Sequence, residues 1–186
     1  MSLSGPPDFR PLMPILHTLS PESAGGFGKA LGTSSLTSTA WGTTNTLAIG
    51  VPIILPVAYT VAKIGWANAA TVTGTVDAGF YDEAGNRIFS VRNLNGDVNV
   101  SQTGASAVQS ATVNQTLQAG RYYIFFTLSG TTATTLCAPT TAVKGRAQGL
   151  VQATVTTAIL ASTLTYAVFN QTFMPFVAIT NRSTQF

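Results

Sequence analysis

Apolar and polar side chains alternate with a period of two along most of the chain after residue 47. Such alternation predicts β-strands, because successive side chains of a strand point to opposite faces of the sheet. The segment 71–81 has one apolar face and one polar face, which is typical of a half-buried antiparallel strand. Its apolar face carries Val72, Gly74, Val76, Ala78 and Phe80, and its second face carries Thr71, Thr73, Thr75, Asp77 and Tyr81.

Segments further along the chain continue the strand pattern. The segment 120–130 is dense in aromatic and β-branched residues and is apolar on both faces, so we predict a central strand there. The segments 150–162 and 164–181 are also predicted as strands, and 105–117 favours strand and loop, so no convincing helix is expected. Roughly eight to ten short strands with Gly and Asn turns indicate an all-β fold, an antiparallel β-sandwich or jelly roll over 47–186.

Residues 1–46 differ from this domain and are predicted to form an extended arm. Five of the nine prolines fall within the first 21 residues, and Gly, Ser and Thr dominate the remainder. Both features oppose helices and favour extended backbone. We expect the arm to bury its apolar side chains on another surface; the alternative is that it packs back on its own domain. These side chains are Phe9, Leu12, Ile15, Leu16, Leu19, Phe27 and Trp41.

The chain carries few charges, which favours an assembly component over a lone monomer. Charged residues make up 8% and apolar residues 45% of the 186 residues, whereas an ordinary soluble domain has roughly 25% charged residues. The longest apolar run, 47–59, is interrupted by Gly50, Pro52 and Pro56, and it is shorter than the ~20 residues that a membrane helix needs. We therefore predict no membrane span and a surface partly buried against other protein chains.

The positive charges form no patch in the sequence. Nine basic and six acidic residues give a formal net charge of +3, and only Lys144 and Arg146 among the basic residues are near neighbours. Nucleic-acid binding needs clustered cations, so no nucleic-acid partner is expected. Cys137 and His17 are each the single residue of their type, which leaves no intrachain disulfide and only one histidine for a catalytic triad. No cofactor is predicted.

Half of the acidic residues gather in one short stretch, which is the strongest candidate for chemistry. Asp77, Asp82, Glu83 and Asn86 offer oxygen ligands for Ca²⁺, but their spacing does not match an EF-hand loop. Two carboxylates could also form a glycosidase pair, which requires one protonated acid and one ionised carboxylate beside a cleft. The local signals favour a β-hairpin turn formed by Asp82, Gly85 and Asn86, in which Asp82 accepts backbone hydrogen bonds and Gly85 takes a positive φ.

The same stretch resembles a motif of known proteins. The segment Pro56–Ser90, which contains "GTVDAGFYDEAGNR", is followed at Gln115–Leu128 by "QTLQAGRYYIFFTL". Together they are similar to a β-sandwich that recurs in virion proteins of tailed bacteriophages. The matching residues are Gly74, Val76, Asp77, Gly79, Tyr81, Asp82, Gly85, Asn86, Arg87, Leu117, Gly120, Tyr122 and Tyr123. The resemblance implies a jelly-roll-like module on a phage particle, and it carries over no catalytic residue.

The resemblance, the low charge and the predicted arm together favour a structural virion protein. We expect a capsid decoration or cement protein on the exterior of the phage head, a homo-oligomeric trimer that binds the major capsid protein or other virion proteins. The alternative is a tail-fibre, tail-tip or spike module that binds host glycans through exposed aromatic residues, with Trp41, Trp66, Tyr81 and Tyr123 as candidates. Enzymatic activity is not expected, because carboxylates are few and the chain has one histidine.

Overall fold

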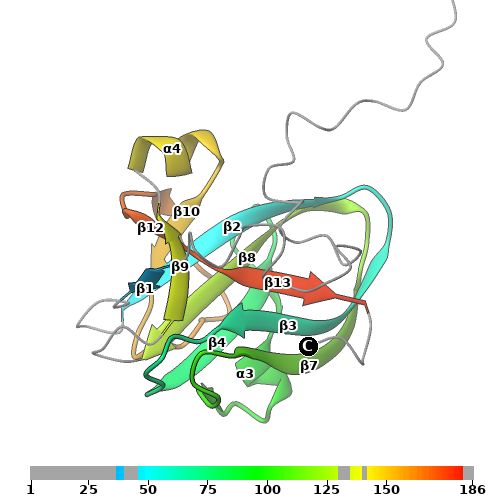
Figure 1. Cartoon of the computed structure of the whole chain (residues 1–186). Helices are drawn as coiled ribbons and strands as arrows, with labels where there is room; N and C mark the ends of the chain where they lie inside the picture. The colour runs from blue at the N-terminus through cyan, green and yellow to red at the C-terminus, as the bar shows by residue number, and fades with distance from the viewer. Residues whose placement is uncertain (1–36, 40–45, 130–134, 140–141, 182–186) are drawn as a thin grey trace, which may run out of the picture.

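The protein is an all-β antiparallel sandwich, as the sequence predicts (Figure 1). The computed structural model describes residues 37–39, 46–129, 135–139 and 142–181. Its strands are β1 (Thr37–Thr39), β2 (Leu47–Leu55), β3 (Tyr59–Ala67), β4 (Thr75–Tyr81), β5 (Arg87–Ser90), β6 (Val100–Ser101), β7 (Val108–Leu117), β8 (Gly120–Ser129), β9 (Thr135–Pro139), β10 (Val151–Thr154), β11 (Ala167–Val168), β12 (Phe173–Pro175) and β13 (Val177–Thr180). Two short helices, α3 (Val91–Leu94) and α4 (Ala142–Ala147), complete the described elements.

The strands form one large sheet and two small ones. The large sheet has the order β11-β10-β2-β8-β4-β5, and β6 also pairs with β4. A second sheet, β13-β3-β7, packs face to face with the large sheet and encloses the main core between them (Figure 1). A third sheet, β1-β9-β12, lies at one end of the sandwich.

Strand β8 is the centre of the fold, and the prediction of a central strand at 120–130 is confirmed. It pairs with β2 on one side and β4 on the other. Because side chains alternate along a strand, Ile124 and Phe126 enter the main core against the second sheet, where the ring of Trp66 lies 6.3 Å from that of Phe126. Phe125, between them, points to the opposite face of the large sheet and is also fully buried.

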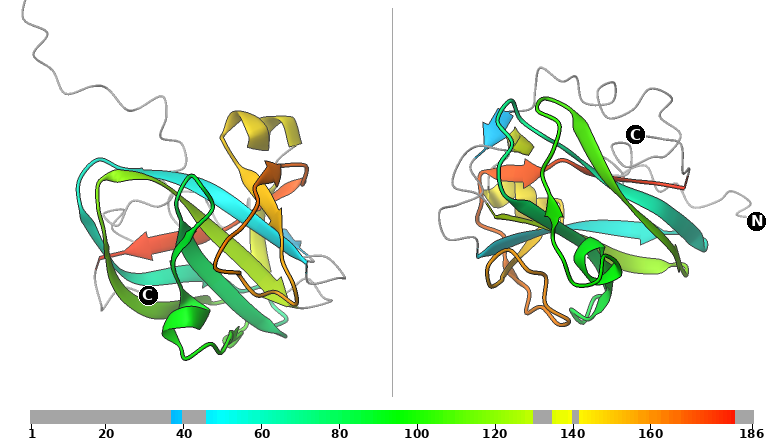
Figure 2. Two further views of the ribbon diagram at one scale, coloured as in Figure 1. Left: turned by 180° about the vertical axis from the view of Figure 1, so that it is seen from behind. Right: turned by 90° about the horizontal axis from the view of Figure 1, so that it is seen from below.

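A second core covers that opposite face. The segment that follows β10, residues 155–166, runs across the back of the large sheet (Figure 2). Its Leu160 and Leu164 pack with Tyr81 and Phe125 in a separate buried cluster. The prediction of a strand over all of 150–162 is therefore wrong beyond Thr154, where the chain leaves the sheet edge and serves as a cover.

The prediction of a half-buried strand over 71–81 is wrong in two respects. The strand begins at Thr75, since Gly74 has φ +89 and turns the chain before it. Both faces of β4 are buried, because the second sheet covers one and residues 155–166 cover the other. Asp77 and Tyr81, expected on a solvent-facing surface, are fully buried.

The two short helices were not predicted from the sequence. Ser90 caps the first turn of α3, where its side chain accepts a hydrogen bond from the backbone N–H of Asn93 at 3.2 Å. Helices of four and six residues are too short to produce a helical period in the sequence. Among the described residues, no helix has the length and apolar character to cross a bilayer.

Only a small part of the predicted arm falls within the described residues. Thr37–Thr39 form β1 and pair antiparallel with β9, so this portion joins the third sheet of the domain itself. The residues predicted to bury against a partner, Phe9, Leu12, Ile15, Leu16, Leu19, Phe27 and Trp41, lie outside the described residues.

Candidate functional site

The sequence places its strongest candidate at the turn between β4 and β5. The backbone N–H of Gly85 donates to the carbonyl oxygen of Asp82 at 3.1 Å, and the N–H of Asp82 donates to the carbonyl of Asn86 at 3.0 Å. Gly85 has φ +88, a left-handed conformation that glycine adopts without a steric penalty. The pairing register of the two strands shifts between Phe80 and Tyr81, as in a β-bulge.

The carboxylate of Asp82 is engaged inside this turn. One oxygen accepts from the backbone N–H of Asn86 at 2.8 Å, and the other accepts from its side-chain amide at 2.9 Å. These hydrogen bonds lower the pKa of Asp82 below 3.8 because they favour the ionised form. The bond from the Asn86 side chain makes the largest contribution to this shift. Asp82 therefore stabilises the turn as an ionised acceptor.

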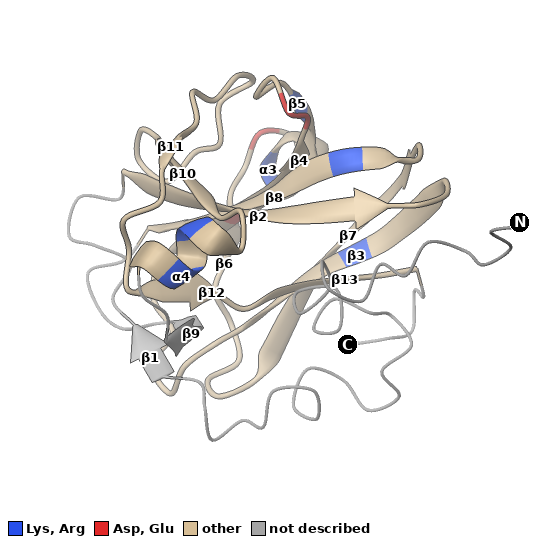
Figure 3. Cartoon of the chain, turned by 90° about the horizontal axis from the view of Figure 1, so that it is seen from above, with Lys and Arg blue, Asp and Glu red and all other residues tan. Residues whose placement is uncertain are grey.

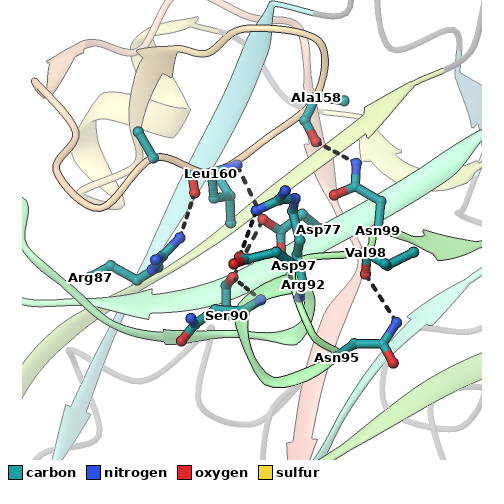
Figure 4. A network of polar contacts seen from close by, with 12 residues as sticks. Asp77, Arg87, Ser90, Arg92, Asn95, Asp97, Val98, Asn99, Ala158 and Leu160 are labelled. Atoms are coloured by element: carbon teal, nitrogen blue, oxygen red, sulfur yellow. Dashed lines mark hydrogen bonds and ion pairs between the residues drawn. The ribbon is translucent and has the colours of Figure 1, made fainter.

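Asp77 lies in the interior and joins three parts of the chain (Figure 4). Its Oδ1 accepts from the backbone N–H of Arg92 at 3.1 Å, and its Oδ2 accepts from the N–H of Leu160 at 3.1 Å and from the hydroxyl of Ser90 at 3.4 Å. Burial raises the pKa of Asp77 above 3.8, and this effect outweighs the three hydrogen bonds and the nearby charge of Arg87, which lower it.

The third acidic residue of the stretch points elsewhere. Glu83 forms an exposed ion pair with Arg121 of β8, with 3.3 Å between Oε1 and Nη1. Asp77, Asp82 and Glu83 thus have three separate sets of partners, and the described residues contain no group of three His, Cys, Asp or Glu side chains positioned to hold a metal ion.

The stretch instead holds residues 155–166 against the large sheet. The backbone N–H of Arg87 donates to the carbonyl of Ser162 at 2.8 Å, and its Nη1 donates to the carbonyl of Leu160 at 2.9 Å. The N–H of Leu164 donates to the carbonyl of Gly85 at 2.8 Å. The hydroxyl of Tyr166 donates to the carbonyl of Asp82. These four long-range hydrogen bonds cross-link the hairpin to residues 155–166 and close the second core.

An open hollow of about 430 Å³ lies next to these cross-links, and its lining combines arginines with aromatic and aliphatic side chains. Strand β8 contributes Arg121 and Tyr123, helix α4 contributes Arg146, and β11 with the residue before it contributes Tyr166 and Val168. The rings of Tyr123 and Tyr166 meet at an angle of 62° with centroids 5.0 Å apart. We call this site the arginine–tyrosine hollow.

Hydrogen bonds and ring contacts hold Arg121, Tyr123 and Tyr166 in the wall of the hollow. The guanidinium carbon of Arg121 lies 5.6 Å from the centroid of the Tyr123 ring, and its Nη2 donates to the Tyr123 hydroxyl at 3.2 Å. Tyr166 stacks on Phe125 with ring centroids 5.2 Å apart. Arg146 is exposed and donates from Nε to the carbonyl of Ala142, one turn earlier in α4, at 3.1 Å.

Sequence reasoning found one residue of this hollow and missed the others. Tyr123, a candidate for glycan contact, does line it, whereas the candidates Trp66 and Tyr81 are wrong because both are fully buried. Arg121 and Arg146 are 25 positions apart in the sequence and gave no local signal of a shared site. Trp41 lies outside the described residues.

No family model, curated protein or solved structure matches this chain.

Proposed function

We propose that this chain is a structural protein of a tailed-bacteriophage particle, a decoration or cement protein on the exterior of the head. It acts as a homo-oligomer, a trimer, that binds the major capsid protein and stabilises the shell by surface burial. The resemblance of residues 74–87 and 117–123 to phage virion sandwiches supports this proposal. The use of Asp77 and Asp82 in internal contacts also supports it, because a motif that cross-links the fold needs no substrate.

The observation that carries the proposal is the edge strand β7. It has ten residues, and within the described part of the chain it pairs with β3 alone and forms the edge of the second sheet. Its sequence, "VQSATVNQTL", contains no charged residue and no proline. Edge strands of monomeric proteins are usually protected by charges, prolines, β-bulges or short length, since an open edge pairs with other chains. Of these devices β7 has a β-bulge, opposite Val61 and Lys63. An edge this long and uncharged is suited to a protein–protein interface.

A trimer gives this edge a defined use. Cyclic trimers need heterologous contacts, in which two different surfaces of neighbouring subunits meet. An extended segment of the next subunit can add to β7 as a further strand through main-chain hydrogen bonds. The part of the predicted arm that precedes β1 would supply such a segment. Few charged residues lie on the described strands (Figure 3). A neighbouring subunit can therefore cover large parts of this surface without the cost of removing charged groups from water.

A charge placed on β7 tests this function. Thr112 is exposed and lies opposite Lys63 of β3, so the substitution Thr112→Glu adds an acidic group to the edge beside a cation of the same subunit. Val98→Glu adds the same charge at a position that is 60% exposed and lies off the edge. Light scattering gives the oligomeric state of each variant, and co-sedimentation with phage heads that lack this chain gives its attachment.

The wild type and Val98→Glu are expected to form trimers and to co-sediment with the heads. Thr112→Glu is expected to be monomeric and to bind at most about a tenth as much, a loss equivalent to ~1.4 kcal/mol. Wild-type protein that does not bind the heads would contradict the proposed function. A Thr112→Glu protein that trimerises and binds normally would contradict the role of β7.

A further inference from the structure

We infer that the arginine–tyrosine hollow binds a pyranose sugar that carries a carboxylate, so that the protein recognises acidic glycans. The inference rests on the charge balance, rigidity and shape of the hollow, and it does not depend on the proposed function. A volume of about 430 Å³ is within the range of small-molecule sites, which combine an apolar lining with a few fixed polar groups.

Arg146 supplies the charge for an anionic group. Its Nε is held by the carbonyl of Ala142, and neither of its terminal amino groups has a partner among the described residues. Its two Nη groups are available as the planar fork that binds a carboxylate with two parallel hydrogen bonds. The other arginine is already compensated, because Arg121 forms its ion pair with Glu83. The hollow therefore has one uncompensated positive charge, which matches a singly charged carboxylate.

The aromatic floor supplies a surface for the sugar ring. The aromatic surface open to a ligand is that of Tyr166, which is partly exposed and whose hydroxyl donates to the carbonyl of Asp82. Tyr123 supports Tyr166 from below as an edge-to-face partner, since it is only 8% exposed and its ring lies under the guanidinium of Arg121. Val168, which is 65% exposed, extends the apolar surface at the rim. A rigid apolar floor binds the C–H face of a pyranose with little loss of side-chain entropy. The open side of the hollow leaves the sugar hydroxyls in contact with water.

The alternative ligands fit these features less well. A neutral sugar leaves Arg146 without a partner and makes no use of the free guanidinium fork. A phosphate group has no ring to cover the apolar surface of Tyr166 and Val168. A sugar acid fits both features, because its carboxylate pairs with Arg146 and its ring packs on the apolar surface.

The experiment measures binding of glucuronic acid, with glucose as its neutral counterpart, by saturation-transfer NMR and titration on the full chain. Arg146→Ala removes the cation, and Lys144→Ala removes a cation of the same helix that does not line the hollow. Val168→Asp places a negative charge at the rim, and Val57→Asp places one at an equally exposed position, also 65%, away from the hollow. Thermal melting of each variant checks that it is folded.

Wild-type protein is expected to bind glucuronic acid. It should bind glucose more weakly by about tenfold or more, and the Arg146→Ala variant should bind glucuronic acid more weakly by a similar factor. Lys144→Ala and Val57→Asp are expected to bind as the wild type does, whereas Val168→Asp is expected to lose the signal. Added salt weakens the interaction, as for a partly exposed ion pair. The inference is overturned if glucuronic acid gives no transfer, if glucose binds equally well, or if folded Arg146→Ala retains wild-type affinity.

Discussion

The carboxylate of Asp77 accepts a hydrogen bond from the backbone N–H of Leu160 at 3.1 Å, although the two residues are 83 positions apart in the chain. Both residues are fully buried. A single side chain therefore joins a central strand of the large sheet to the irregular segment that covers it. Buried donors and acceptors are costly to leave unpaired, so this contact makes the cover and the sheet depend on each other.

The substitution Asp77→Asn is expected to lower the free energy of unfolding by about 2 kcal/mol. An amide has one acceptor oxygen, so either the N–H of Arg92 or that of Leu160 loses its partner and faces an NH₂ group. Urea unfolding followed by circular dichroism measures the change. Asp97→Asn is the matched control, because it removes a carboxylate from the exposed ion pair with Arg92. Equal stability of the two variants would contradict the assigned role of Asp77.

The two carboxylates of the stretch are expected to give opposite pH dependences. The pKa of Asp77 is raised above its unfolded value of 3.8, so its contribution is greatest below pH 3.8 and declines as pH rises toward the folded pKa. The pKa of Asp82 is lowered below 3.8, so its contribution is present above pH 3.8 and is lost as pH falls.

Stability differences between the wild type and single variants isolate these two effects. The wild-type advantage over Asp77→Asn is expected to shrink as pH rises above 3.8, and the advantage over Asp82→Asn to shrink as pH falls below 3.8. Urea titrations in steps of pH measure both differences. Two curves that slope in the same direction would show that one of the two pKa shifts has the wrong sign.

Gly85→Ala is expected to destabilise the protein by about 3 kcal/mol or more. The reason is a steric clash of the added methyl group with the neighbouring backbone. A Cβ at this position would lie 2.1 Å from the carbonyl oxygen of Leu164, and φ is +88. Gly96 also has a positive φ, +63, but a Cβ there meets nothing within 4 Å. Gly96→Ala should therefore cost only the left-handed backbone penalty of about 1–2 kcal/mol, and chemical denaturation separates the two values.

Deletion of residues 1–36 is expected to abolish trimer formation and attachment to phage heads while the sandwich remains folded. The deletion keeps β1, which pairs with β9, and it keeps both buried cores. Far-UV circular dichroism and thermal melting report the fold, and light scattering and co-sedimentation report the assembly. A truncated protein that decorates heads normally would exclude the predicted arm from the attachment site.

Local signals in the sequence were sufficient for features whose partners are close in the chain. The positive φ of Gly85 and the contacts between Asp82 and Asn86 involve residues within five positions of one another. The apolar residues on both faces of 120–130 likewise predicted the central strand, because two covered faces require two apolar sets of side chains.

Features that depend on distant partners escaped prediction. Asp77 alternates with apolar residues and therefore suggested a solvent-facing side, yet it is buried, and one of its three hydrogen-bond donors belongs to the distant Leu160. The hollow depends on α4 lying beside β8 and β11, and none of Arg121, Arg146 and Tyr166 is close to another in the sequence. A pattern with a period of two defines which side chains share a face, but not what later covers that face.

The cover formed by residues 155–166 also has a consequence for biosynthesis. A nascent chain leaves the ribosome from its N-terminus, so β2, β4 and β8 emerge before Leu160 and Leu164 are made. Until then the back of the large sheet exposes its aromatic side chains, among them Phe125. Asp77 lacks the hydrogen bond from the backbone N–H of Leu160 and remains accessible to water. Completion of the domain is thus delayed until residues 155–166 have left the ribosome. A ribosome that stalls before that point would leave a sheet with an exposed hydrophobic face, which is a substrate for chaperones.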